Sequence, residues 1–105
     1  MPQLDETFNG QSVTLRPGEV LDIALPEART TGFQWHVREG AAQVSELEEE
    51  STEVPPGPPG RGGLHRWRFR ATHPGEANIL LHYRRPWEPD AAPGRVFQVQ
   101  LRVSE

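Results

Sequence analysis

The sequence predicts an all-β protein that folds as an antiparallel sandwich of seven or eight short strands. Apolar and polar residues alternate in several runs, most clearly in residues 77–83 and 97–103, and this alternation is typical of half-buried strands. Glycine and proline separate the runs at intervals that are typical of sandwiches. A chain of 105 residues can bury a single two-layer core, so we expect residues 1–105 to form one domain.

The first half of the chain provides three of the expected strand regions. Residues 7–15 alternate weakly and are expected to form one or two edge strands. In residues 20–25, Leu21, Ile23 and Leu25 recur at every second position, and Pro26 ends the strand that they form. Residues 33–38 form a half-buried strand. Its core-facing side is expected to carry Phe33, Trp35 and Val37.

The second half of the chain joins further strands by unusual connections. A weak strand at residues 44–47 is followed by an acidic run that ends at Glu53, which we interpret as a solvated face or a loop. Residues 54–63 are so rich in proline and glycine that they can form neither helix nor interior strand, and loops of this length are usually functional or disordered. The next strand has arginine at every second position, and we expect this stripe to face the glutamates. The stripe consists of Arg66, Arg68 and Arg70.

Residues 84–89 connect the two most regular strand patterns, and their prolines prevent them from continuing either strand. We place Trp87 at the tip of this loop, beside two arginines. An exposed tryptophan next to arginine is typical of binding surfaces. The alternative is that Trp87 folds back and caps the core, because tryptophan is much buried on average.

The order of the strands places three connections at the same end of the sandwich. If each strand runs antiparallel to the one before it, successive connections alternate between the two ends. Residues 30–32, 55–63 and 84–94 are each separated by two strands, so we expect all three at one end. The turns near residues 40 and 74 fall at the other end.

Bulk composition excludes several classes of partner and chemistry. The net charge of −4 and the isoelectric point near 5.5 argue against nucleic acid, since binding a phosphate backbone requires a basic surface. The chain has no cysteine, which excludes disulfides, thiolate nucleophiles and thiolate metal sites. Neither a signal peptide nor a membrane span is recognisable. We therefore expect no membrane partner, and either a cytoplasmic protein or the mature form of an exported one.

The sequence offers no recognisable catalytic or metal-binding pattern. The serines lie in no nucleophile-elbow motif, and no histidine has a recognisable catalytic partner. The histidines also lack the spacing of metal ligands. The glycines around Arg61 are not followed by the helix and lysine of a phosphate-binding loop. We therefore expect no catalytic residue, no metal and no cofactor.

Three short motifs occur one after another along the chain. They are Thr30-Thr31-Gly32-Phe33-Gln34-Trp35, then Gly60-Arg61-Gly62-Gly63, then Arg85-Pro86-Trp87. Each motif alone is weak, but the ordered set resembles the chagasin-like inhibitors of papain-family cysteine peptidases. The resemblance extends from about Leu21 to Val103, and it includes Trp67, Phe69 and Tyr83.

The resemblance implies an immunoglobulin-like β-sandwich with Greek-key connections that inhibits papain-like cysteine peptidases reversibly and non-covalently. It also implies that three loops at one pole enter the active-site cleft, the first near the catalytic cysteine, the second on the substrate-specificity side and the third on the leaving-group side. A monomer is sufficient for this activity. The implied peptidase-binding residues are, loop by loop, Arg29, Thr30, Thr31, Gly32 and Phe33, then Gly60, Arg61, Gly62 and Gly63, then Arg85, Pro86 and Trp87.

One position departs from the family motif, in which Asn-Pro precedes Thr-Thr-Gly. Ala28-Arg29 stands in that place here. Without the proline the loop lacks one φ constraint and is expected to lose more conformational entropy on binding. Arg29 adds a fixed positive charge near the cleft, so affinity and choice of target are the properties that this change affects.

Two other functions are compatible with the sequence. A carbohydrate-binding or adhesion module would use Trp87 and Phe33 as a stacking platform for a sugar or another protein. A small hydrolase would need a serine or a carboxylate in a pocket. Inhibition of a papain-type enzyme separates the inhibitor from both, and binding to a glycan array identifies the first alternative.

Overall fold

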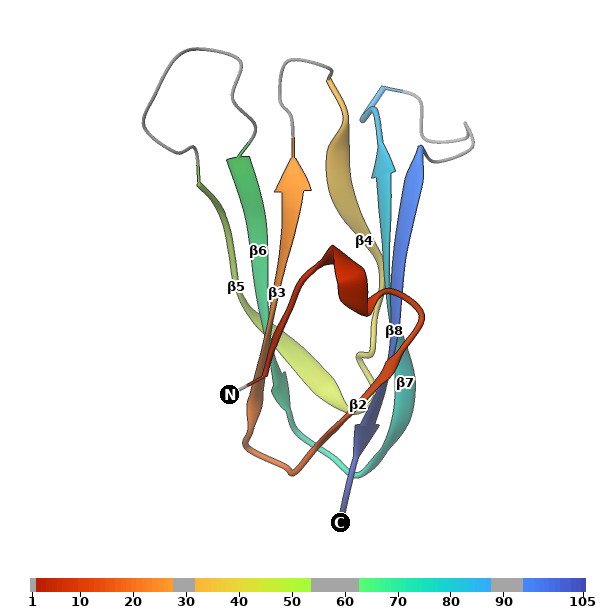
Figure 1. Ribbon diagram of the computed structural model, residues 1–105. Coiled ribbons are helices and arrows are strands. Elements are labelled where there is room, and N and C mark those ends of the chain that lie inside the picture. The colour runs from red at the N-terminus through yellow and green to blue at the C-terminus, as the bar shows by residue number, and fades with distance from the viewer. Residues whose placement is uncertain (1, 28–31, 54–62, 88–93) are drawn as a thin grey trace.

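The computed structural model describes residues 2–27, 32–53, 63–87 and 94–105, which form eight strands and one short 3-10 helix (Figure 1). The strands are β1 (Gln3–Leu4), β2 (Ser12–Leu15), β3 (Val20–Glu27), β4 (Gln34–Gly40), β5 (Ser45–Glu53), β6 (Gly63–Ala71), β7 (Gly75–Arg84) and β8 (Arg95–Val103). The helix η1 spans Glu6–Phe8. Within the four described ranges, no helix has the length and hydropathy that crossing a membrane requires.

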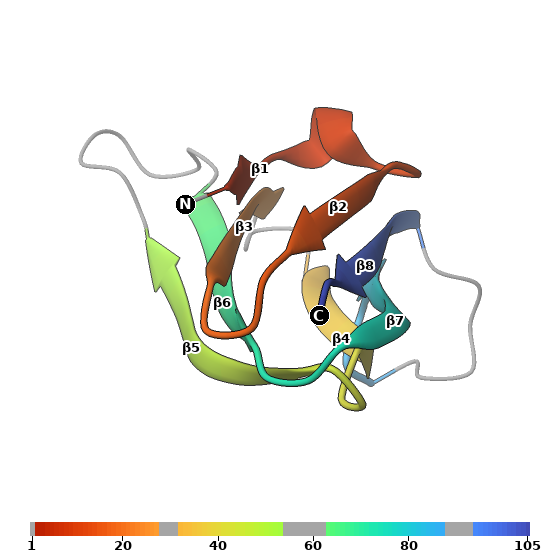
Figure 2. The same ribbon diagram turned by 90° about the horizontal axis from the view of Figure 1, so that it is seen from below.

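The strands form two four-stranded sheets that pack face to face, which confirms the predicted sandwich (Figure 2). One sheet has the order β1-β3-β6-β5 and the other has the order β2-β8-β7-β4. Neighbours are antiparallel within the central pairs β3–β6, β5–β6, β4–β7 and β7–β8. The chain crosses between the sheets from β3 to β4, returns from β4 to β5 and crosses again from β6 to β7, as in Greek-key sandwiches.

The N-terminal segment contributes an edge strand to each sheet. The predicted edge strand within residues 7–15 is present as β2, which pairs in parallel with β8, and β1 pairs in parallel with β3. Between them, η1 carries the chain from one sheet to the other (Figure 2). The Asp5 side chain accepts a hydrogen bond from the Thr7 backbone N–H at 2.9 Å, which satisfies one of the free donors at the start of η1.

The core lies between the sheets and is built by alternate side chains, as the sequence pattern predicts. Burial alternates residue by residue along β3 and β8. Trp35 is buried as predicted, but Val37 is 36% exposed. Val37 lies next to a register shift between Val37 and Glu39, on β4 at the edge of its sheet, where the core is incompletely covered. The buried apolar residues are Leu4, Leu15, Leu21, Ile23, Leu25, Trp35, Ala41, Val44, Trp67, Phe69, Ala71, Ile79, Leu81, Phe97, Val99, Leu101 and Val103.

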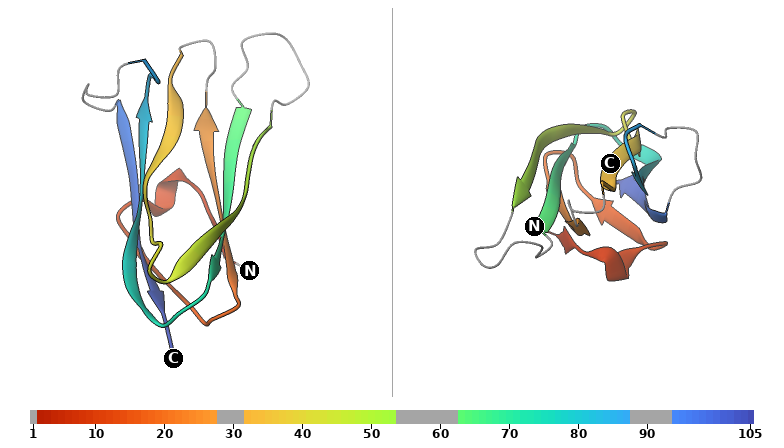
Figure 3. Two further views of the ribbon diagram at one scale, coloured as in Figure 1. Left: turned by 180° about the vertical axis from the view of Figure 1, so that it is seen from behind. Right: turned by 90° about the horizontal axis from the view of Figure 1, so that it is seen from above.

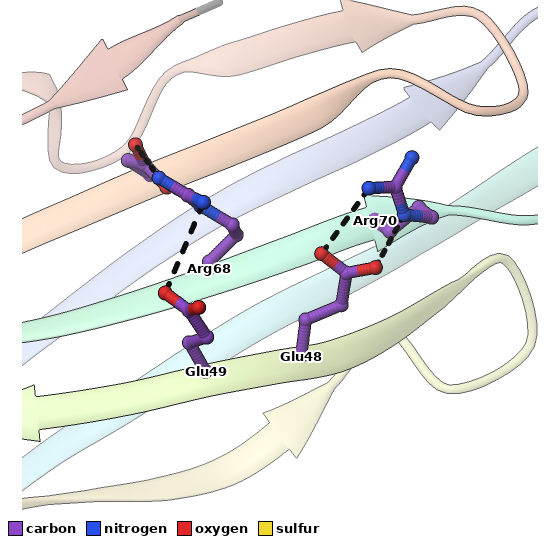
Figure 4. Close-up of polar contacts among 5 residues, drawn as sticks. Glu48, Glu49, Arg68 and Arg70 are labelled. Atoms are coloured by element: carbon purple, nitrogen blue, oxygen red, sulfur yellow. Dashed lines mark hydrogen bonds and ion pairs between the residues drawn. The ribbon is translucent and has the colours of Figure 1, made fainter.

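The acidic run forms strand β5, so the alternative in which it is a loop is wrong, whereas its solvent exposure is confirmed. Its carboxylates face the arginine stripe of β6, as expected (Figure 4). Most of these ion pairs are exposed to solvent, which screens them, so they stabilise the fold only slightly. The pairs are Arg66 with Glu53, Arg68 with Glu49 and with Asp22, and Arg70 with Glu48.

Candidate functional site

Strands that flank the three predicted loops end at one pole of the sandwich. Glu27 at the end of β3 pairs with Gly63 at the start of β6, and Tyr83 near the end of β7 pairs with Arg95 at the start of β8. The ends of β3, β5 and β7 and the starts of β4, β6 and β8 lie together at one end of the molecule (Figures 1 and 3). The strand directions therefore agree with the predicted meeting of the three motifs.

The structure describes part of the predicted peptidase-binding set. Residues outside the described ranges are Arg29, Thr30, Thr31, Gly60, Arg61 and Gly62. Gly63 is the first residue of β6 and belongs to the sheet. Of the predicted set, Gly32, Phe33, Arg85, Pro86 and Trp87 are described and lie between strands at the pole. They come from the first and third motifs, so the contacts at the pole can be followed for these two.

Trp87 is exposed at the pole and rests against the backbone of Gly32. It is 66% exposed, so the alternative in which it caps the core is wrong. A methyl group on Gly32 would lie 2.7 Å from Cη2 of Trp87, closer than side-chain carbons approach one another. Gly32 also has a φ of +78°, which residues with a side chain rarely adopt. Only glycine at this position allows the first and third motifs to touch in this way.

A stack of aromatic and guanidinium groups supports the pole from beneath. Arg85 lies over the Phe33 ring, with its guanidinium carbon 4.8 Å from the ring centroid. Phe33 stacks on Tyr83 at 5.3 Å, and Tyr83 contacts Trp35 with 4.9 Å between centroids. Contacts of these kinds contribute roughly 0.5–1.5 kcal/mol each. Phe33 and Arg85 are half-buried and join the two motifs, whereas Trp87 presents its ring to solvent.

A buried cluster of carboxylate and imidazole groups lies at the base of the first motif. Glu27 is 5% exposed and His65 is 7% exposed. Oε2 of Glu27 accepts a hydrogen bond from the Trp35 backbone N–H and contacts Nδ1 of His65, both at 2.9 Å. Nε2 of His65 lies 2.7 Å from Oε2 of Glu50. The Trp35 indole N–H donates to the Pro26 carbonyl at 2.9 Å. These contacts tie β3, β4, β5 and β6 together near the pole.

This cluster belongs to none of the three motifs, although the sequence carries a signal for it. Glu27 continues the core-facing series of β3 beyond Leu25, and His65 begins the series that continues with Trp67. A charged group at a core-facing position needs a partner, because burying an unpaired charge is very costly. Antiparallel pairing of β3 with β6 brings Glu27 and His65, the polar members of these two core-facing series, close together.

Near the pole, His36 has an imidazole that resists protonation. It lies on β4 opposite His82 of β7 in the pairing register. Partial burial, and to a smaller extent the positive charge of Arg84, lower the pKa of His36 below its ordinary value of 6.5. The folded protein therefore favours the neutral ring at this position.

We expect the protein to lose stability through His36 as the pH falls below about 6.5. The folded state has the lower pKa, so the unfolded chain binds the proton more readily and acid favours unfolding. The contribution is complete above the unfolded-state value and is lost as the pH falls through the folded-state pKa. Urea unfolding of the unmodified protein and of His36→Gln between about pH 7 and about pH 5 measures the effect. His36→Gln should lose less stability over this interval.

His73→Gln is the matched control for this prediction, because His73 is an exposed histidine in the turn between β6 and β7. This variant should follow the pH dependence of the unmodified protein. If the free energy of unfolding changes with pH in the same way for His36→Gln and the unmodified protein, the pKa of His36 is not lowered by folding.

The chemistry of the described pole is that of a contact surface. It supplies an exposed indole, a glycine backbone without a side chain, and a guanidinium group held over an aromatic ring. Tryptophan and arginine of this kind dominate the energetics of protein interfaces. In the part of the chain that the structure describes, no group of three or more His, Asp or Glu residues could hold a metal ion.

Comparison with known proteins gives a consistent result. A family model described as "Chagasin family peptidase inhibitor I42" matches residues 14–101. Amoebiasin-1 of Entamoeba histolytica is 34% identical over 100 residues, which covers 95% of this chain and 97% of that protein. Chagasin of Trypanosoma cruzi is 30% identical over 108 residues and covers 97% of each chain. A cysteine protease inhibitor from Entamoeba histolytica has a similar fold in its crystal structure, with a TM-score of 0.87 at 21% identity over 97% of this chain and 94% of that chain.

Proposed function

Because the chain belongs to the chagasin family of peptidase inhibitors, we propose that it blocks papain-like cysteine peptidases by inserting one pole of its sandwich into their active-site cleft. Membership makes the chain a cysteine peptidase inhibitor, and the proposal concerns how it binds. Binding is reversible and non-covalent, and one domain acts as a monomer. The chain is not itself a peptidase.

The observation that carries this proposal is the contact between Trp87 and Gly32. It holds a large exposed aromatic ring in place at the pole before any partner binds. The stack of Arg85, Phe33 and Tyr83 holds the same two motifs together from below. A surface that is already ordered loses less conformational entropy on binding, and this favours tight inhibition.

The three motifs have different places in the proposed complex. Residues 29–33 approach the catalytic cysteine, where the backbone of Gly32 allows close contact. Residues 60–63 lie on the substrate-specificity side of the cleft. Residues 85–87 pack on the leaving-group side, with Trp87 as the main anchor. An interface of about 1,600 Å² in total would be typical of a protease–inhibitor complex.

Titration of papain and of a cathepsin with the purified protein tests the proposal. We expect residual activity to fall to zero at stoichiometric amounts, inhibition to be competitive with a peptide substrate, and activity to return on dilution. The mass of the recovered inhibitor should be unchanged. Full activity of both enzymes in a large excess of the protein would contradict the function, and inhibition that persists after dilution would contradict its reversibility.

The family match supports inhibition over the alternative of a carbohydrate-binding or adhesion module. The exposed ring of Trp87 by itself would suit either function. We expect the unmodified protein to show no specific binding on a glycan array. Specific glycan binding that is lost in Trp87→Ala would instead support the alternative.

We expect Gly32→Ala to raise the inhibition constant by about tenfold, because the backbone of the free variant relaxes away from positive φ, and restoring the binding geometry costs on the order of 1–2 kcal/mol. The added methyl group also displaces the Trp87 ring from its place over Gly32. The measurement is the inhibition constant against papain, together with the thermal midpoint, which should fall only slightly.

Gly18→Ala is the matched control for this substitution. Gly18 has a φ of +93°, but no atom lies within 4 Å of the position that its Cβ would occupy. It belongs to the connection between β2 and β3, away from the pole (Figure 1). Gly18→Ala should therefore carry a similar backbone cost and leave inhibition unchanged. Equal inhibition by Gly32→Ala and the unmodified protein would show that the contact with Trp87 is unimportant.

A further inference from the structure

The buried cluster of Glu27, His65 and Glu50 is complete only when the imidazole carries two protons. An ionised carboxylate can only accept hydrogen bonds, and a neutral imidazole donates from one nitrogen. Both ring nitrogens of His65 face carboxylate oxygens, at 2.9 and 2.7 Å. The ring also stacks on Trp67 with 4.0 Å between centroids and an angle of 13°, and the face of an indole attracts a cation. The contacts therefore favour an imidazolium at His65.

The cluster lies at the base of two of the three peptidase-binding segments. The hydrogen bond from the Trp35 N–H to Glu27 closes the base of residues 28–34. His65 lies on β6, which together with β5 flanks residues 54–62. The bond also joins β3 of one sheet to β4 of the other, so it acts between the two layers of the sandwich.

We propose that His65 is a positioning residue for inhibition: its imidazolium holds Glu27, and through Glu27 the base of the central segment, in the geometry that binds the peptidase. This inference rests on the proposed function. When the proton is lost, a ring lone pair faces a carboxylate oxygen and one of the two hydrogen bonds breaks. The buried Glu27 carboxylate then faces a neutral ring instead of a cation, and the base of the segment loosens. Inhibition should therefore weaken as the pH rises.

Among the described residues, His36 and Arg66 also lie near the cluster. His36 on β4 interacts electrostatically with the cluster and favours the neutral ring, since its own pKa is lowered by burial and then by Arg84. Arg66, next to His65 on β6, is paired with Glu53 at 3.2 Å. Within the cluster, two carboxylates contact one imidazolium.

The first test compares His65→Gln with the unmodified protein in inhibition of papain between about pH 5 and about pH 8, the range in which histidine changes charge. Glutamine can donate to one carboxylate but does not titrate. The ratio of the two inhibition constants cancels the pH dependence of the enzyme. We expect a ratio of about ten at the acid end, which corresponds to one lost hydrogen bond to a charged group. The ratio should fall towards one as the pH rises. A ratio that stays the same across this range overturns the inference.

Glu50→Gln provides a second variant that should fold normally, because Glu50 is exposed on β5. Its amide can donate to Nε2 of a neutral His65, so the cluster is satisfied without the extra proton. At the same pH, the unmodified protein and this variant should inhibit about equally at the acid end of the range, and the variant should inhibit more strongly than the unmodified protein at the alkaline end. A pH profile identical to that of the unmodified protein contradicts the inference.

His73→Gln is the control for both variants and should match the unmodified protein at every pH. If neither this variant nor the unmodified protein inhibits, the proposed function fails and this inference fails with it. If both inhibit and His65→Gln behaves like His73→Gln, only this inference fails. The ring nitrogens of His65 in the free protein, observed by NMR, give a readout without peptidase. Both should carry protons at the acid end, and one should lose its proton over the interval in which inhibition weakens.

Discussion

Replacing Trp87 with alanine is expected to raise the inhibition constant against a papain-type peptidase by more than tenfold while leaving the thermal midpoint nearly unchanged. Trp87 is 66% exposed, so its removal takes little apolar surface out of the folded protein. In a complex the same ring would be buried at the interface. Truncating a tryptophan that anchors an interface typically costs about 2–4 kcal/mol. Inhibition constants and thermal unfolding of the same two preparations measure both effects.

Leu47→Ala is the matched control for Trp87→Ala. Leu47 is also a large exposed apolar residue, at 44% exposure, but it lies on β5 far from the pole. Its truncation should change neither inhibition nor stability appreciably. If Trp87→Ala lowers the thermal midpoint by several degrees, its ring stabilises the fold and its role as an anchor is wrong. A comparable loss of inhibition in both variants would show that binding extends beyond the pole.

Replacing Glu27 with alanine is expected to lower the free energy of unfolding by about 3 kcal/mol, because it removes a buried acceptor with two partners. The Trp35 backbone N–H and Nδ1 of His65 would both lose their bonds to Oε2. For a domain of this size the thermal midpoint should fall by roughly 10–20 °C. Urea unfolding monitored by tryptophan fluorescence gives the free-energy difference directly.

Glu53→Ala is the control for Glu27→Ala, because both glutamates end strands of the same sheet next to the pole. The side chain of Glu53 is 58% exposed and pairs with Arg66 at 3.2 Å. Loss of such a pair should cost no more than about 1 kcal/mol. Similar losses in the two variants would show that the buried cluster contributes no more than a surface ion pair does.

The fold could be predicted from the sequence because most strands bury one face only. In β3 and β8 the apolar positions of the sequence are the buried positions of the structure. Strand β5 was harder, since it lies at a sheet edge and most of its side chains face solvent, so the acidic run shows no apolar alternation. The β1 and β2 pairings are short and parallel, and no local pattern specifies a parallel partner far away in sequence.

The meeting of the strand ends that flank the three motifs could also be predicted, because counting strands is enough to place them at one pole. The contacts within the pole could not be predicted from the sequence. Whether Trp87 would cap the core or meet Gly32 depends on the path of the chain after Arg84, which composition does not fix. The pairing of Glu27 with His65 depends on the register of β3 against β6, and that register emerges only from the whole sheet.

The carboxylates along β5 have a consequence for the behaviour of the protein at high concentration. An outer strand of nine residues offers unpaired backbone groups that a second copy could join to extend the sheet. Two copies approaching through this strand would bring two rows of glutamate side by side, and their mutual repulsion opposes the union. The acidic residues thus oppose polymerisation of the protein through the exposed edge of β5.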